Sequence, residues 1–419
     1  MIKFFLLYFY LLLIISSILG YGFLLAGFLN KNLLKYNLGY IGILGLLALT
    51  IISYATIFFF KHNYLHNLIV HIIGLTYFLF FFYKLKINKD YILLIILIFL
   101  LSSALLILKN HDDFSYYHLT FALGLTENKI QLGLGNLGYG YRHHSSLFYL
   151  NSLIFLPYIK FYLFHSIGFI TLIFVNFICL KFLLNKKEFN SFNYVYIFYL
   201  IAFVYINSKF YRISEYGTDI AAQLIVLVLI PLVLLTFRRN LIKIEFKNNV
   251  QLLILLISYI VTVKTYFIVY SLFLFLILFL FYKRNYLVRI FFASRATIVA
   301  VLTLALFSLV NLSYTGCVIY PLKETCFSKK ISWSLDRQEV QRMKIWYEQW
   351  SKGGASPHHR AENPKEYIKN FNWVKGWTSI YFFNKGLENL ASILFLSILF
   401  IIIFYRNKRK FSENFNKDL

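Results

Sequence analysis

Ionisable side chains suited to catalysis are concentrated in one long polar segment, residues 109–152. It contains the adjacent carboxylates Asp112 and Asp113, and His118 follows them closely. Long polar loops in an otherwise apolar chain commonly carry function. One aspartate could act as general base on an acceptor hydroxyl, or ligate a divalent cation such as Mg²⁺ or Mn²⁺ that neutralises a phosphate leaving group. The alternative is a solvated helix end without a chemical role.

The same segment continues with glycines and then basic residues. Gly133, Gly135 and Gly138 match G-x-G-x-x-G, but no strand–turn–helix pattern surrounds them. We therefore interpret them as residues that let the loop turn sharply, not as a dinucleotide site. His118, Arg142 and His143 are candidate substrate ligands, and arginine in particular suits bidentate capture of phosphate or carboxylate. The alternative for Arg142 is snorkelling towards lipid headgroups, and no zinc-binding spacing of histidines is present.

Three further ionisable residues lie at the edges of apolar runs. Glu215 and Asp219 open one run, where acidic side chains can simply complement a helix dipole. Asp219 and Gln223, one turn apart, also predict a polar stripe that enters the membrane. Glu215 and Asp219 are therefore candidate substrate ligands in a second acidic site near the first. Lys264 interrupts the run 251–282; a lysine there is costly and is commonly paired with an anion, for which a phosphate headgroup is the expected partner. Snorkelling is again the alternative.

The composition predicts an all-α polytopic membrane protein. Hydrophobic residues make up 60% of the 419 residues and charged residues only 14%. The net charge of +25 does not indicate nucleic acid, because the basic residues cluster in connections between apolar runs. A membrane-crossing helix needs about 20 apolar residues. Runs that meet or approach this length cover residues 4–28, 38–60, 65–83, 91–108, 161–184, 194–206, 218–237, 293–311 and 387–405.

The run 251–282 is too long for one crossing, so we interpret it as a tight hairpin of two short helices that brings the total to about eleven crossings. Alternate connections carry most of the basic residues and are placed in the cytoplasm. The loop after residue 109, the connection 208–217, the turn at Lys264 and the loop 312–386 then share the extracytoplasmic side. Residues 147–158 are too short to span and predict an interfacial helix.

The chain divides into four predicted regions. These are an N-terminal three-helix membrane module (1–90), a transmembrane core (91–311) with an outer loop (109–160), an extracytoplasmic loop (312–386), and a last helix with a basic cytoplasmic tail (387–419). Cys317 and Cys326 lie in the late loop, where an oxidising compartment would permit a disulfide. Trp346 and Trp350 share a helical face there. They could dock on the membrane, cover the active loop or stack against a glycan, and docking on the membrane is the expectation.

The sequence HDD at the end of an apolar run, the outer loop after it, and Lys264 within VTVKTYF together resemble the GT-C superfamily of integral-membrane glycosyltransferases. The similarity covers roughly residues 91–281. It implies transfer of a sugar from a polyprenyl-phosphate donor to a lipid-linked or cell-envelope glycan acceptor, on the extracytoplasmic face of a bacterial plasma membrane. It also implies that Asp112 or Asp113 is the catalytic acidic residue and that Lys264 contacts the donor phosphate.

The sequence departs from that superfamily because three crossings precede the acidic loop, so residues 4–83 would be an added module. The full motif set also resembles poorly characterised bacterial polytopic membrane proteins. One alternative is an O-antigen-type polymerase or ligase that works through late-loop residues, here Arg337, Arg342, His358, His359 and Arg360. Another is a lipid or solute transporter (flippase), which would need ionisable residues along the bilayer midplane. The sugar and the acceptor stay open.

Overall fold

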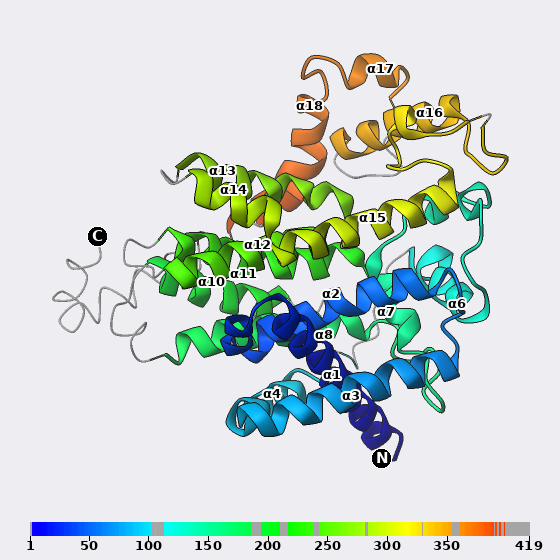
Figure 1. Ribbon diagram of the computed structural model, residues 1–419. Coiled ribbons are helices and arrows are strands. Elements are labelled where there is room, and N and C mark those ends of the chain that lie inside the picture. The colour runs from blue at the N-terminus through cyan, green and yellow to red at the C-terminus, as the bar shows by residue number, and fades with distance from the viewer. Residues whose placement is uncertain are drawn as a thin grey trace. The chain divides into compact units, whose positions relative to one another are not determined.

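The computed structural model describes residues 2–102, 105, 113–185, 194–209, 217–237, 243–280, 284–328, 330–353, 361–388, 390–391, 394 and 398. Within these ranges the chain is helical, with no β-strand and only two isolated bridges (Figure 1). The prediction of an all-α fold is therefore confirmed. Several predicted site residues lie outside the described residues, namely Asp112, Glu215, His358, His359 and Arg360.

Seven helices in the described ranges are long and apolar enough to cross a membrane, so the chain is a polytopic membrane protein. They are α1 (Ile2–Leu29), α2 (Leu38–Thr56), α3 (Tyr64–Leu85), α8 (Ser166–Leu183), α11 (Thr218–Thr236), α12 (Lys243–Val263) and α15 (Arg295–Thr315). Shorter helical segments include α4 (Asn88–Leu101), α10 (Tyr194–Lys209), η6 (Thr265–Ser271), α13 (Leu272–Leu280) and α14 (Arg284–Ala293). Because most of the run 387–405 lies outside the described residues, the count of eleven crossings stays a prediction.

For the run 251–282, the predicted interruption at Lys264 is correct, but the predicted start of the first helix at residue 251 is wrong. Helix α12 ends at Val263, and Lys264 has an extended backbone with φ −153° and ψ 118°. The helix begins at Lys243, however, because polar side chains in its early turns find partners inside the bundle. Asn248 accepts a hydrogen bond from the Asn30 amide at 2.9 Å, and Asn249 accepts one from the Tyr36 hydroxyl. Paired in this way, these asparagines can be buried without the cost of an unsatisfied polar group.

Two short helices follow the polar segment. The π-helical turn η2 (Phe114–His118) continues into α6 (Leu119–Glu127), and α7 (Ser146–Leu153) comes after the glycine-rich loop. Helix α7 is too short to span, as predicted, but it is buried in the bundle and does not lie on its surface. Its residues Leu147 to Leu150 are each at most 4% exposed, and α7 packs against α2, α6 and α8.

Glycines bring the first three helices into close contact. Gly22 and Gly45 lie where α1 packs on α2, and Gly20 and Gly74 lie where α1 packs on α3. A Cβ atom at any of the four positions would overlap an atom of the neighbouring helix, for example the carbonyl oxygen of Ile18 in the case of Gly45. Small residues at such interfaces let helix backbones approach closely in the membrane.

Replacing Gly45 with Ala is expected to destabilise the protein by about 1–3 kcal/mol, because the added methyl group forces α1 and α2 apart. The matched control is Gly27→Ala in α1, where the nearest atom to an added Cβ is 3.9 Å away on Phe81. Thermal unfolding in detergent should show a lowered midpoint for Gly45→Ala and an unchanged or slightly raised midpoint for the control. Equal midpoints for the two variants would contradict the close packing.

The chain folds into two compact units. Unit 1 comprises residues 1–131 and 143–310, and unit 2 comprises residues 132–142 and 311–419. Unit 2 contains the Cys317–Cys326 disulfide, whose formation the sequence had left open. Its helical segments are η3 (Leu134–Asn136), η4 (Tyr139–Arg142), η7 (Lys323–Thr325), α16 (Arg337–Lys352), α17 (Pro364–Tyr367), α18 (Val374–Trp377) and η8 (Thr378–Gly386). The glycine-rich part of the predicted outer loop thus belongs to unit 2.

Candidate functional site

One end of unit 1 brings together segments that are far apart in the sequence. The Ile130 amide donates to the carbonyl oxygen of Ile57 after α2, at 3.0 Å, and the Ser145 hydroxyl donates to that of Val263 at the end of α12, at 2.8 Å. At the other end of the bundle, Lys181 forms an ion pair with Asp90 at 2.7 Å. Segments that the basic-residue pattern predicted on one side of the membrane therefore meet at one end of the unit.

Asp113 and Asp219 both lie near the phenol of Tyr117. Asp113 is half-buried and immediately precedes η2, and Asp219 lies in the first turn of α11. Burial raises the pKa of Tyr117, and the negative charges of Asp113 and Asp219 raise it further. Because one phenol is affected by both carboxylates, the two predicted acidic positions belong to the same region. Short π-helical turns such as η2 are frequent at functional sites.

Lys264 pairs with Asp219 at the start of α11. Its Nζ lies 2.9 Å from the Asp219 carboxylate and donates a longer bond of 3.5 Å to the Thr218 hydroxyl. The side chains are 39% and 50% exposed, so the pair adds little stability and is accessible to a ligand. The Tyr266 hydroxyl is hydrogen-bonded to Gln223, which lies on the predicted polar stripe. Lys264 thus has an anionic partner within the protein, while its contact with a phosphate stays a prediction.

A small pocket adjoins this ion pair. Its polar lining comprises His118, Asn151, His165 and Thr218, and Phe114, Leu147, Phe148 and Phe164 contribute apolar walls. His118 is 5% exposed, with its ring centroid 4.4 Å from that of Tyr117. Burial lowers the pKa of His165 to about 4, so its imidazole is neutral at physiological pH. Since Thr218 both lines the pocket and accepts from Lys264, the pocket and the ion pair form one continuous site.

Sequence reasoning missed Asn151 and His165. Each is a single polar residue in an apolar stretch, LFYLNSLIF and FYLFHSIGF respectively. An isolated amide or imidazole in such a stretch needs a hydrogen-bond partner when it is buried. That requirement is the feature of the sequence that could have identified both residues.

A polar cluster from α3 fixes helix α7, which carries Asn151. The Asn67 amide nitrogen donates to the carbonyl oxygens of Ser152 at 2.8 Å and Phe155 at 2.9 Å. The His71 ring bonds to the carbonyl oxygen of Leu153 at 3.1 Å. The last carbonyls of a helix have no partner within it, so these side chains satisfy groups that would otherwise be buried and unpaired.

His62 completes this support. Its Nδ1 lies 2.6 Å from the Ser152 hydroxyl, and its ring stacks on that of His66 with the centroids 4.8 Å apart. His62 is fully buried, and burial lowers its pKa to about 3. It therefore acts as a neutral hydrogen-bonding partner. The N-terminal helices consequently position the pocket wall through α7.

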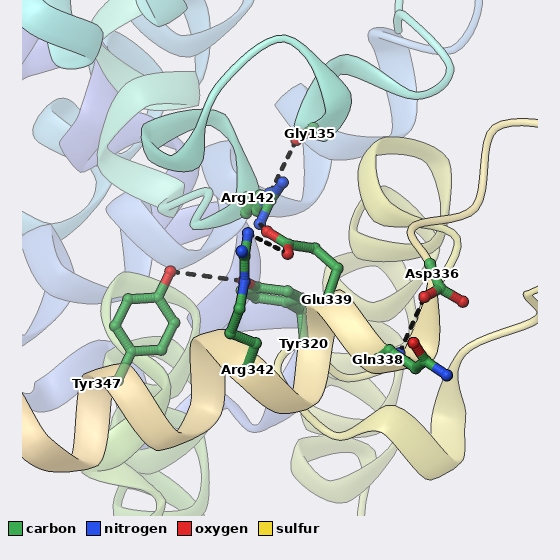
Figure 2. A network of polar contacts seen from close by, with 8 residues as sticks. All are labelled: Gly135, Arg142, Tyr320, Asp336, Gln338, Glu339, Arg342 and Tyr347. Carbon is green, nitrogen blue, oxygen red and sulfur yellow. Dashed lines mark hydrogen bonds and ion pairs between the residues drawn. The ribbon is translucent and has the colours of Figure 1, made fainter. Parts of the chain in front are cut away.

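The predicted anion ligand Arg142 is engaged within unit 2 (Figure 2). Its side chain is 8% exposed; Nε donates to the carbonyl oxygen of Gly135 at 3.0 Å, and Nη1 pairs with Glu339 of α16 at 3.0 Å. The guanidinium is also hydrogen-bonded to Tyr320 and stacks over Tyr139, 4.6 Å from the ring centroid. These contacts favour a structural role, fastening residues 132–142 to the rest of unit 2. His143 is exposed.

The glycine-rich stretch packs closely within unit 2. Gly133 has a positive φ of 75°, and its amide donates to the carbonyl oxygen of Ser313 at 2.8 Å. A Cβ atom on Gly135 would lie 2.9 Å from the carbonyl oxygen of Tyr314. A sharp turn and a close backbone approach thus account for these glycines, as the sequence interpretation expected.

Among the described residues, no group of three or more His, Cys, Asp or Glu side chains lies close enough to hold a metal ion. Of the two carboxylates predicted to ligate a divalent cation, Asp113 belongs to the described residues and Asp112 lies outside them. A cation at that pair stays a prediction.

Comparison with known proteins identifies a family. No curated protein and no solved structure matches the chain. A family model described as a domain of unknown function, DUF8201, matches residues 1–415. The chain belongs to the DUF8201 family.

Proposed function

We propose that this protein is a GT-C-like glycosyltransferase of a bacterial plasma membrane. It would move a sugar from a polyprenyl-phosphate donor to a lipid-linked or cell-envelope glycan acceptor on the extracytoplasmic face. The observation that carries the proposal is the convergence of Asp113, Asp219 and Lys264 around one small pocket, at one end of a helical membrane unit. An acidic group beside a cation at the edge of a membrane suits transfer from a lipid phosphate.

The residues take complementary roles in this reaction. Asp113, or Asp112 beside it, removes the proton from the acceptor hydroxyl, whose oxygen then bonds to the anomeric carbon of the sugar. The bond from that carbon to the phosphate oxygen breaks, and the lipid phosphate leaves with the bonding electrons. Lys264 stabilises the departing phosphate, and the amide groups at the start of α11 favour negative charge at the same place.

Further residues belong to the same proposed site. His118 supplies hydrogen bonds to the sugar from the wall of the pocket. Glu215, which precedes α11, and His143, which is exposed, are retained as predicted substrate ligands. A divalent cation at the aspartate pair would share the neutralisation of the phosphate with Lys264.

The contacts of Arg337 favour this site over one of the polymerase or ligase type. Arg337 donates from Nε and Nη2 to the carbonyl oxygen of Cys326, at 3.2 and 3.0 Å. Arg342 pairs with Glu339, which also holds Arg142 (Figure 2). Arg337 therefore has a structural partner within unit 2, whereas Arg342 is 69% exposed and stays accessible.

The proposal is tested by comparing lipid-linked glycans from cells with and without the protein. Loss of a transferase should leave an acceptor shortened by one sugar, and that intermediate should be extended when purified protein and a polyprenyl-phosphate sugar are added. Accumulation of complete single repeats would instead indicate a polymerase or ligase. Accumulation of complete lipid-linked glycan on the cytoplasmic side would indicate a flippase, and either result would overturn the proposal.

A further inference from the structure

We infer that the pocket beside Thr218 receives an uncharged group that carries hydroxyls, and that Asn151 recognises one of those hydroxyls. This inference rests on the proposed function and deepens it, because the group would be a neutral rather than an acidic sugar. Asn151 would then be a residue that determines specificity.

The first observation is the state of the Asn151 side chain. Its Oδ1 is shielded from solvent and accepts no hydrogen bond from any residue in the described ranges, and Asn151 lines the pocket. Buried polar atoms in native proteins nearly always have a partner, and one left unpaired costs about 1–3 kcal/mol. A hydroxyl of a bound group can supply the missing donor.

The second observation is that Asn151 is held in place. The next residue, Ser152, is fixed through its carbonyl oxygen by Asn67 and through its hydroxyl by His62. The Asn151 amide therefore projects from a segment whose backbone is anchored from behind. A fixed acceptor discriminates between ligands better than a mobile one, because little ordering is needed on binding.

The third observation is that the described residues of the lining include no carboxylate, ammonium or guanidinium group. Among the described residues, which leave out 106–112 and 210–216, the lining contains no Asp, Glu, Lys or Arg, and the pKa of His165 is lowered to about 4 by burial. A carboxylate that entered this pocket would lose its hydration without gaining a lysine or arginine partner from these residues, which is costly. Lys264 lies outside the lining. Its ion pair with Asp219 is partly exposed to solvent, so its ammonium group is available to a phosphate at the edge of the pocket.

Binding of octyl glycosides tests the inference directly. The probes are octyl glucoside, galactoside and mannoside together with the corresponding octyl uronides, added to full-length protein in phosphatidylethanolamine–phosphatidylglycerol nanodiscs and followed by saturation-transfer NMR. We expect at least one neutral glycoside to bind about tenfold or more tightly than its uronide, which corresponds to about 1.4 kcal/mol. Tighter binding of uronides, or binding of no neutral glycoside, would overturn the inference.

Two variants assign the effect to Asn151. Asn151→Leu keeps the branched shape of the side chain but removes its hydrogen-bonding atoms. It should weaken binding of the neutral glycoside about tenfold through loss of the hydrogen bond. Asn128→Leu makes the same change at an exposed position just after α6 and should bind as the wild type does. If Asn151→Leu binds the neutral glycoside as tightly as the wild type does, only water donates to Asn151 Oδ1 and the inference fails.

A series of deoxy-glycosides keeps the test valid if Asn151→Leu folds poorly. In the wild type, removal of one particular hydroxyl from the ligand should weaken binding about tenfold, whereas removal of the others should have less effect. Equal effects of all hydroxyls would contradict recognition by a single amide.

The inference and the proposed function can fail separately. Binding of the neutral glycosides and transfer of a sugar are measured separately on the wild-type protein. If binding follows the expected pattern but no sugar transfer is found, the pocket assignment stands and the proposed reaction falls. If transfer is found but Asn151→Leu changes neither binding nor sugar preference, only the pocket assignment falls.

Discussion

Asp113→Asn is expected to lower the rate of sugar transfer by about 10²- to 10⁴-fold, the usual contribution of a general base. An amide of the same shape cannot take a proton from the acceptor hydroxyl. The substitution should leave the fold intact, since Asp113 is only half-buried and precedes η2 without capping it through its side chain. The measurement is the initial rate of transfer from a polyprenyl-phosphate sugar in proteoliposomes, with thermal unfolding measured for each variant.

Two comparisons make this result interpretable. Asp90→Asn removes a carboxylate from an ion pair with Lys181 at the other end of the bundle, and it should transfer at the wild-type rate. Asp112→Asn distinguishes the neighbouring carboxylates, because a single general base is enough to take the proton from the acceptor hydroxyl. Wild-type rates in both Asp112→Asn and Asp113→Asn would remove the catalytic assignment.

Asn67→Leu is expected to destabilise the protein by about 2–5 kcal/mol, because it leaves several buried carbonyl oxygens without donors. The two N–H groups of the Asn67 amide are shared among the carbonyl oxygens of His62, Ser152 and Phe155, at 2.8 to 2.9 Å, and Asn67 itself is fully buried. Thermal and denaturant unfolding in detergent measure the loss.

The outcome of Asn67→Leu also bears on the pocket. Since Ser152 follows Asn151 directly, we expect a loss of neutral-glycoside binding at temperatures where the variant is still folded. Asn63→Leu is an unsuitable control because Asn63 caps α3, whereas Asn128→Leu tests the same chemical change at an exposed position. A midpoint for Asn67→Leu equal to that of Asn128→Leu would show that α7 does not depend on this anchor.

The helices were largely predictable because long apolar runs have few alternatives in a membrane chain. The break at Lys264 was predictable for the same reason, since a lysine interrupts such a run. The start of α12 was not, because the partners of Asn248 and Asn249 come from α1 and the segment before α2. Pairing between distant segments leaves no periodic signal in either one.

The candidate site was predictable by residue type but not by arrangement. Asp113, His118, Asp219 and Lys264 were conspicuous as ionisable residues in an apolar chain, and the structure places them in one region. Arg142 was equally conspicuous, yet its guanidinium serves the packing of unit 2. An ionisable residue has the same appearance in the sequence whether its partner is a ligand or another side chain.

Because residues 132–142 belong to unit 2, truncation of the chain is a poor way to separate the two units. The chain changes units after residues 131, 142 and 310, so a deletion that begins at residue 311 would not release unit 1 cleanly. The glycine-rich residues 132–142 would remain without their contacts to Ser313 and Tyr314. Arg142 would lose its ion pair with Glu339. Loss of activity in such a truncated form would report damage to the α6–α7 connection as much as removal of the C-terminal part. Point changes at Glu339 are the cleaner way to ask what unit 2 contributes.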